Sequence, residues 1–140
     1  MEDVAPRRRS AAVAWLPPLA WGAALLVLSA QPAGRFPAAG LPHLDKLVHG
    51  ALYAVLGALT GRALALRAPA GRIAAAVVAA AAVSLVGFGA LDEWSQGFSP
   101  GRTTSVADLA ADAIGAWIGL LAASRYHGRR HGIPAQLPRR

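Results

Sequence analysis

A chain of 140 residues that is 55% hydrophobic and only 15% charged is too apolar for an ordinary soluble domain and too short for a second domain. The absence of Cys excludes disulfides, thiolate metal sites and thiol nucleophiles. The net charge of +7 does not indicate nucleic-acid binding, because the basic residues lie between and beyond apolar segments instead of along one amphipathic face.

Four apolar stretches have close to the ~20 residues that an α-helix needs to cross a hydrocarbon core. They span residues 11–30, 47–66, 73–91 and 106–124. We therefore predict an all-α fold, a four-helix transmembrane bundle that occupies residues 11–124. The lipid bilayer is then the first partner of the chain, and its location is the inner or plasma membrane as a multi-pass protein.

The first stretch admits two interpretations. Pro17 and Pro18 near its start either open a transmembrane helix or kink it, because proline removes a backbone donor. Alternatively, the arginines at positions 7–9 and the apolar run form a signal peptide that is cleaved near Ala30. We favour the transmembrane helix because the run is long for the apolar part of a signal peptide.

The basic residues predict the orientation of the bundle. Eleven of the 14 fall at the two termini or around the connection at residues 62–72, and three fall on the opposite side. By the positive-inside rule, both termini are cytoplasmic. Residues 1–10 form a basic cytoplasmic N-terminus, and residues 125–140 form a basic, disordered cytoplasmic tail.

Acidic residues and a histidine recur at helical spacing near the outer helix ends, where positions three or four apart share a face. Asp45 and His49 are four apart, with Tyr53 one turn further, and we expect Asp45 to fix the His49 ring. The other spaced pairs are Asp92 with Gln96, Glu93 with Gln96, and Asp108 with Asp112. Three helices thus direct polar pairs toward one side of the membrane.

Two further features border these pairs. The turn-rich segment at residues 97–102 ends in Arg102, whose planar fork of donors suits a carboxylate or a phosphate. Gly57 with Gly61, and Gly115 with Gly119, form small-xxx-small patterns that permit close helix approach. We expect packing within the monomer from these patterns, with an oligomer interface as the alternative.

The motifs occur in an order that resembles the VanZ-like family of small bacterial integral membrane proteins. They are Asp45-Lys46-Leu47-Val48-His49, Glu93-Trp94-Ser95-Gln96, Gly101-Arg102, and Asp108 followed by Asp112, Gly115 and Gly119. The resemblance runs from about Ser29 to Gly119 and implies an association with low-level resistance to the glycopeptide teicoplanin. It also implies Asn at the position of Asp112, where this chain has Asp.

Two function classes remain open for the polar residues. In the first, an enzyme or a binding site acts on a lipid-linked envelope precursor or another lipid headgroup. His49, Glu93 and Arg102 are then the catalytic candidates, and Asp45, Lys46, Gln96, Asp108 and Asp112 are the binding candidates. In the second, the same residues are a structural or partner-binding network.

Asp45, His49, Glu93 and Asp108 are acceptable metal ligands, but a single His leads us to predict no metal site. The cofactor and the oligomeric state stay open.

Overall fold

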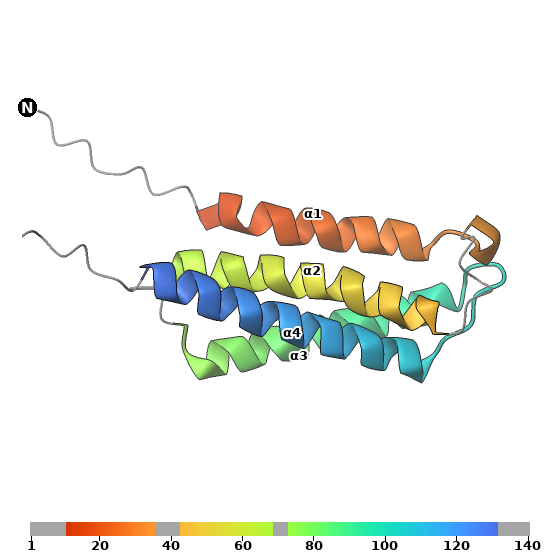
Figure 1. The fold of residues 1–140 in the computed structure, drawn as a ribbon. Helices are drawn as coiled ribbons and strands as arrows, with labels where there is room; N and C mark the ends of the chain where they lie inside the picture. Colours follow the sequence, from red (N-terminus) through yellow and green to blue (C-terminus); the bar gives the residue numbers. More distant parts are fainter. Residues whose placement is uncertain (1–10, 36–42, 69–72, 132–140) are drawn as a thin grey trace, which may run out of the picture.

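The computed structural model describes residues 11–35, 43–68 and 73–131. Within these ranges the chain forms four α-helices and one short 3-10 helix, without a strand (Figure 1). The elements are α1 (Ala11–Ser29), η1 (Ala33–Arg35), α2 (Leu44–Arg67), α3 (Ala75–Gln96) and α4 (Val106–His131). The predicted all-α fold with four helices is confirmed. The start of α1 and the end of α4 lie at one end of the elongated bundle, and the other ends of these helices lie together at the opposite end (Figure 1).

Polar residues extend three helices beyond their predicted ends. Helix α2 begins at Leu44 instead of residue 47, α3 ends at Gln96 instead of residue 91, and α4 runs to His131 instead of residue 124. The prediction followed apolar stretches, whereas a helix continues as long as its backbone groups find partners. The first part of the predicted disordered tail is therefore helical. Residues 1–10 and 132–140, to which the other terminal predictions refer, lie outside the described residues.

Helix α1 passes through Pro17 and Pro18, so the prolines do not open the helix. It is joined to α2 by Trp21, whose Nε1 donates a hydrogen bond to the backbone oxygen of Leu52 at 3.0 Å. Leu25 of α1 is buried in the hydrophobic core, which also contains Leu56 of α2. Helix α1 therefore contributes both apolar and polar contacts to the bundle.

Helices α2 and α4 form the most extensive helix pair, and glycines allow their backbones to meet. A Cβ atom on Gly57 would overlap the backbone oxygen of Ala116, and one on Gly119 would overlap the backbone oxygen of Ala54. Gly61 is also close, because a Cβ there would lie 2.6 Å from a backbone oxygen of α4. Both small-xxx-small patterns therefore pack against the partner helix of the same monomer.

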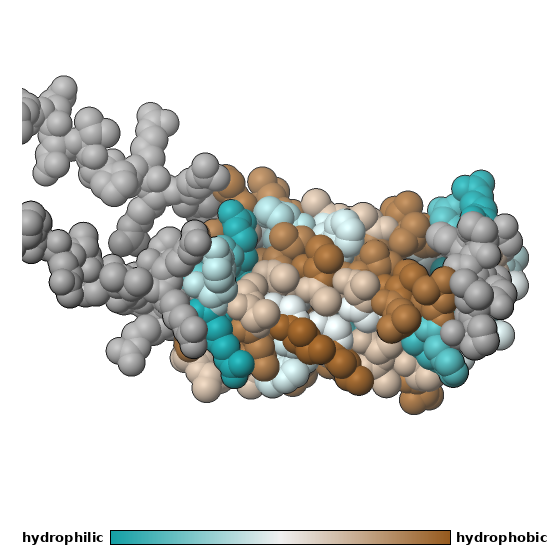
Figure 2. Space-filling model, viewed as in Figure 1, coloured by the Kyte–Doolittle hydropathy of each residue, from teal (hydrophilic) through white to brown (hydrophobic). Residues whose placement is uncertain are grey.

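The sides of the bundle are apolar. Figure 2 shows hydrophobic residues over the middle of the visible face and hydrophilic residues toward its two ends. All four helices are long and apolar enough to cross a membrane, and only 17–33% of each span is buried inside the bundle. The remaining apolar surface requires a lipid environment. The chain is therefore a multi-pass membrane protein.

Candidate functional site at one end of the bundle

The ends of α1 and α3 and the starts of α2 and α4 lie together at one end of the bundle (Figure 1). Polar side chains from all four helices gather there. We call this region the polar end. Its buried polar residues are Ser29, Asp92, Glu93, Gln96, Asp108 and Asp112. Burial of so many ionisable groups among apolar helices is costly unless they are paired, hydrated or bound to a ligand. The partners of each group therefore indicate what the polar end can do.

His49 of α2 faces Asp112 of α4 in the interior of the polar end. The His49 Nδ1 lies 3.1 Å from Asp112 Oδ1, and the Asp112 side chain is 1% exposed. This partner differs from the predicted one, since Asp45 is held by Lys46 at 2.7 Å instead. The cause is the glycine packing, because Gly50 beside His49 brings α4 within van der Waals reach of α2. Asp112 thereby takes the orienting role that the sequence analysis gave to Asp45.

Lys46 joins α2 to α4 nearer the surface. Its Nζ donates to Asp108 Oδ1 at 3.0 Å and to Asp45 Oδ2 at 2.7 Å. The Asp45 side chain is 55% exposed, so solvent screens its pair with Lys46 and the pair contributes little to stability. We therefore interpret Asp45, Lys46 and Asp108 as a rim in which the two carboxylates fix the position of the Lys46 ammonium group. Other side chains form the interior of the site.

Glu93 of α3 takes part in capping α4. Ser105 precedes α4, and its Oγ accepts a hydrogen bond from the backbone N–H of Asp108 at 3.2 Å. In a capping box the third residue of the helix returns the bond to the capping N–H. Here Glu93 Oε1 accepts the Ser105 N–H instead, while Asp108 binds Lys46. Glu93 thereby helps to fix the residue at which α4 begins. Its second oxygen, Oε2, takes no part in this cap.

Replacement of Ser105 by Ala should lower the free energy of unfolding by about 1 kcal/mol, the usual cost of removing a helix cap. Unfolding by SDS in mixed micelles, followed by circular dichroism, measures this change. Ser84→Ala is the control, since Ser84 Oγ is exposed and bonds only the Ala80 oxygen of its own helix. An equal loss in both variants would show that Ser105 has no capping role.

Asp92 is a central residue of the polar end that the sequence analysis did not include among the site candidates. It is 1% exposed, and its Oδ2 accepts hydrogen bonds from Ser29 Oγ at 2.9 Å and Tyr53 OH at 3.1 Å. Gln96 Nε2 in turn donates to Ser29 Oγ at 3.4 Å. Asp92 therefore connects α1, α2 and α3. The i,i+4 spacings of Tyr53 after His49 and of Gln96 after Asp92 were the available sequence signals for this part of the site.

Arg102, the predicted binder of an anion, lies between the end of α3 and the start of α4. Its guanidinium donates a hydrogen bond to the backbone oxygen of Ser29 at 3.0 Å. The same connection is joined to the segment after α1 by the bond from Ala33 N to Pro100 O at 3.3 Å. Arg102 therefore stands at the surface of the polar end, beside the residue that binds Asp92.

The interior acids keep oxygens that no described protein atom binds. These buried atoms are Asp92 Oδ1, Glu93 Oε2 and Asp112 Oδ2. One potential ligand atom from each of His49, Glu93 and Asp112 lies within 4.8 Å of the others. An imidazole held by a carboxylate is also an arrangement that can accept or donate a proton. The site is thus equipped for proton transfer or for binding a cation.

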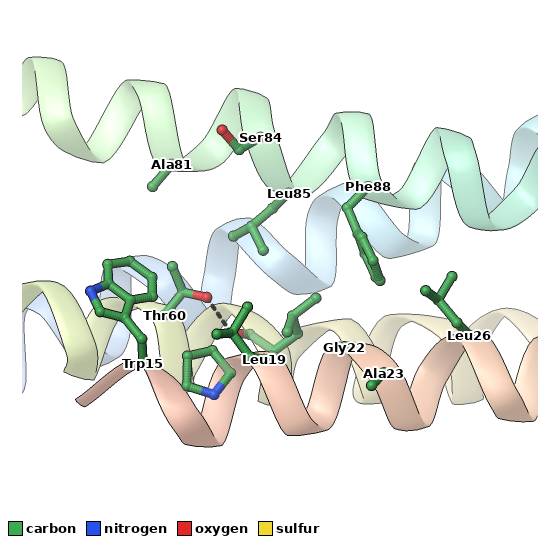
Figure 3. A pocket seen from close by; sticks show the side chains of 12 residues that line it. Trp15, Leu19, Gly22, Ala23, Leu26, Thr60, Ala81, Ser84, Leu85 and Phe88 are labelled. Carbon is green, nitrogen blue, oxygen red and sulfur yellow. Dashed lines mark hydrogen bonds between the residues drawn. The ribbon is translucent and has the colours of Figure 1, made fainter. Parts of the chain in front are cut away.

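An apolar pocket of about 520 Å³ lies between α1 and α3, over α2 (Figure 3). In Figure 3 its walls include Trp15 and Leu26 of α1, Ala81 and Phe88 of α3, and Thr60 of α2. Thr60 and Ser84 are the polar exceptions, and their hydroxyls donate to the backbone oxygens of Leu56 and Ala80 of their own helices, each at 2.9 Å. The pocket therefore offers an almost wholly apolar surface to any occupant.

The pocket approaches the polar end along two helices. Leu26 precedes Ser29 by three residues on α1, and Phe88 precedes Asp92 by four residues on α3. These spacings correspond to about one helical turn, or roughly 5 Å. An elongated ligand with an apolar chain and a polar head would match this succession of surfaces.

Comparison with known proteins relates the chain to a family. A family model described as VanZ/LLP1 matches residues 10–127. The matched range includes every polar-end residue described above. No curated protein and no solved structure matches the chain.

Proposed function

The chain belongs to the VanZ/LLP1 family, and from this premise and the geometry of the polar end we propose that it binds an envelope lipid or a lipid-linked cell-wall precursor. The acyl chain occupies the pocket between α1 and α3, and the anionic headgroup meets the polar end. Such binding would alter susceptibility to the glycopeptide teicoplanin, which the minimum inhibitory concentration of cells with and without the protein measures.

The succession of apolar pocket and polar end is the observation that carries this proposal. The pocket is lined mostly by apolar side chains of α1, α2 and α3, and it ends about one turn before Ser29 and Asp92. Ligand sites of this volume usually bind apolar bodies and orient them through a few polar groups. A membrane lipid has this division between chain and headgroup.

Fixed cations at the polar end support an anionic headgroup. Lys46 is held between Asp45 and Asp108, and Arg102 is held by the backbone oxygen of Ser29. A guanidinium binds phosphate or carboxylate oxygens through a planar fork of donors. We therefore assign Arg102 the main role in headgroup recognition, with Lys46 as the second cation.

The polar end faces the extracytoplasmic side in this proposal. The support is the distribution of basic residues, with eleven near the opposite end or in the termini and three on the side of the polar end. Lipid-linked cell-wall precursors are used on the extracytoplasmic side, which is the side that this orientation exposes.

The orientation can be tested by cysteine labelling because the natural chain has no Cys. Phe98 lies at the polar end and is 73% exposed, while Tyr126 lies near the far end of α4 and is 52% exposed. A membrane-impermeant maleimide should label Phe98→Cys in intact cells and Tyr126→Cys only after permeabilisation. The reverse labelling pattern would show that the polar end faces the cytoplasm. The site would then have no access to extracytoplasmic lipids.

Lipid binding is tested by native mass spectrometry of the protein purified in mild detergent. We expect one anionic lipid per chain and at least a tenfold lower occupancy in Arg102→Ala, because the headgroup loses a charged donor fork. Ala81→Phe should also release the lipid by filling the pocket, since Ala81 lines its wall.

Two matched variants control this experiment. Arg35→Ala removes another cation near the polar end, which bonds Gln31 at 2.8 Å, and Ala80→Phe adds the same ring to an exposed neighbour of Ala81. Both should retain the lipid. Equal retention by all four variants would contradict the proposed binding mode.

A further inference from the structure

In contrast to the prediction of no metal site from the sequence, we propose that His49, Glu93 and Asp112 bind one divalent metal cation inside the polar end. The three side chains come from α2, α3 and α4, and one ligand atom from each lies within 4.8 Å of the others. Ligands on one cation with bonds of about 2.1 Å are separated by roughly 3–4 Å, so small side-chain rotations are enough to close the site. The inference is independent of lipid binding.

The partners of the carboxylates support a cation more directly than their proximity does. Glu93 Oε1 accepts the Ser105 N–H, while Glu93 Oε2 has no partner among the described residues. Asp112 also has a buried oxygen, Oδ2, without a partner among the described residues, while its Oδ1 lies beside His49 Nδ1. Each acid therefore has a buried oxygen that is available to a ligand.

Carboxylate oxygens fixed by the protein are the usual support of a metal site. Hydrogen bonds from surrounding groups orient the ligating side chains and set their basicity. The Ser105 N–H performs this role for Glu93. His49 Nδ1 and Asp112 Oδ1 lie 3.1 Å apart, which is within the separation expected for two ligands on one cation, so the cation takes the place of the proton between them and binds Nδ1 of the neutral imidazole.

The charges in the interior also favour a cation. Glu93 is 5% exposed and Asp112 is 1% exposed, and Asp92 beside them is 1% exposed with its own unpartnered oxygen. Lys46 is engaged nearer the surface by Asp45 and Asp108. Buried carboxylates persist when they are paired or when they coordinate a metal. A divalent ion would balance two of them at once.

The ligand set indicates the kind of cation. One imidazole nitrogen and two carboxylate oxygens suit first-row divalent ions such as Zn²⁺ or Mn²⁺, whereas Mg²⁺ and Ca²⁺ prefer oxygen ligands alone. Three protein ligands leave at least one coordination position for water or another small ligand. The site would therefore be open in the manner of catalytic metal sites.

Equilibrium dialysis of the full chain in detergent, with any tag removed and after treatment with EDTA, tests the site. We expect one Zn²⁺ per chain and much weaker retention of Mg²⁺. His49→Asn, Glu93→Gln and Asp112→Asn should each lower the Zn²⁺ affinity by about tenfold or more. His43→Asn is the control and should retain wild-type affinity, since His43 is exposed and outside the cluster.

Wild-type protein loaded with Co²⁺ gives a second measurement that does not depend on the folding of any variant. Visible absorption bands of a coordinated Co²⁺ ion, removed by stoichiometric Zn²⁺, would support the site. The absence of stoichiometric Zn²⁺, Mn²⁺ and Co²⁺ binding by the wild type would overturn it. A loss of affinity in His43→Asn equal to that in the ligand variants would overturn it as well.

Discussion

Replacement of Gly119 by Leu should prevent the bundle from folding, because the α2 backbone occupies the space that the new side chain needs. A Cβ atom at this position already overlaps the backbone oxygen of Ala54. Overpacking a core usually costs about 1–3 kcal/mol, and a rigid backbone obstacle raises the cost beyond that range. Loss of the helical signal at low SDS and loss of protein from the membrane fraction are the measurements.

Gly87→Leu is the matched control for this substitution. Gly87 is also in the middle of a membrane helix, but nothing lies within 4 Å of a Cβ atom added there. The control should accumulate and unfold like the wild type, since Leu is also a better helix former than Gly. If Gly119→Leu accumulated and unfolded like Gly87→Leu, the result would contradict the close contact between α2 and α4. It would also contradict the pairing of His49 with Asp112, which depends on that contact.

The hydrophobic pattern predicts the helices of this chain because a membrane helix must be apolar over a length fixed by the bilayer. It does not predict their ends. Helix α3 continues through Asp92, Glu93 and Gln96 because these side chains have partners on other helices or in the following loop. A search for apolar stretches ends before such residues, although they belong to the helix.

The candidate site shows a similar division between local and long-range information. The i,i+4 rule correctly indicates residues that share a helix face, but it assigns Asp45 to His49 because both are on α2. The pairing with Asp112 depends on the approach of α2 to α4 at Gly50 and Gly115. That approach joins positions 63 residues apart, so spacing along one helix does not reveal it.

Asp92 shows that a motif of residues close in sequence omits contacts between helices. Its neighbour Glu93 belongs to the quoted family motif, whereas Asp92 is identified by its contacts with Ser29 and Tyr53. Both donors come from helices that precede α3 in the chain. Their roles become visible only when the three helices are placed together.

Replacement of Asp92 by Ala should lower the free energy of unfolding by about 2 kcal/mol, because two buried hydroxyls lose their shared acceptor. Each buried polar group left without a partner costs roughly 1–3 kcal/mol, and removal of the unpartnered Oδ1 returns part of this loss. SDS unfolding of the purified protein measures the difference. Asp45→Ala is the control and should cost less than about 1 kcal/mol, since the Asp45 side chain is 55% exposed.

A double-mutant cycle with Tyr53→Phe separates this hydrogen bond from the remaining effects of the substitution. If Tyr53 OH donates to Asp92, the cost of Tyr53→Phe should be smaller by about 1 kcal/mol when Asp92 is already Ala. Strict additivity of the two substitutions would contradict the bond. A measured coupling would instead establish that α2 and α3 are joined by polar contacts below the rim formed by Lys46, which keeps the interior acids in place.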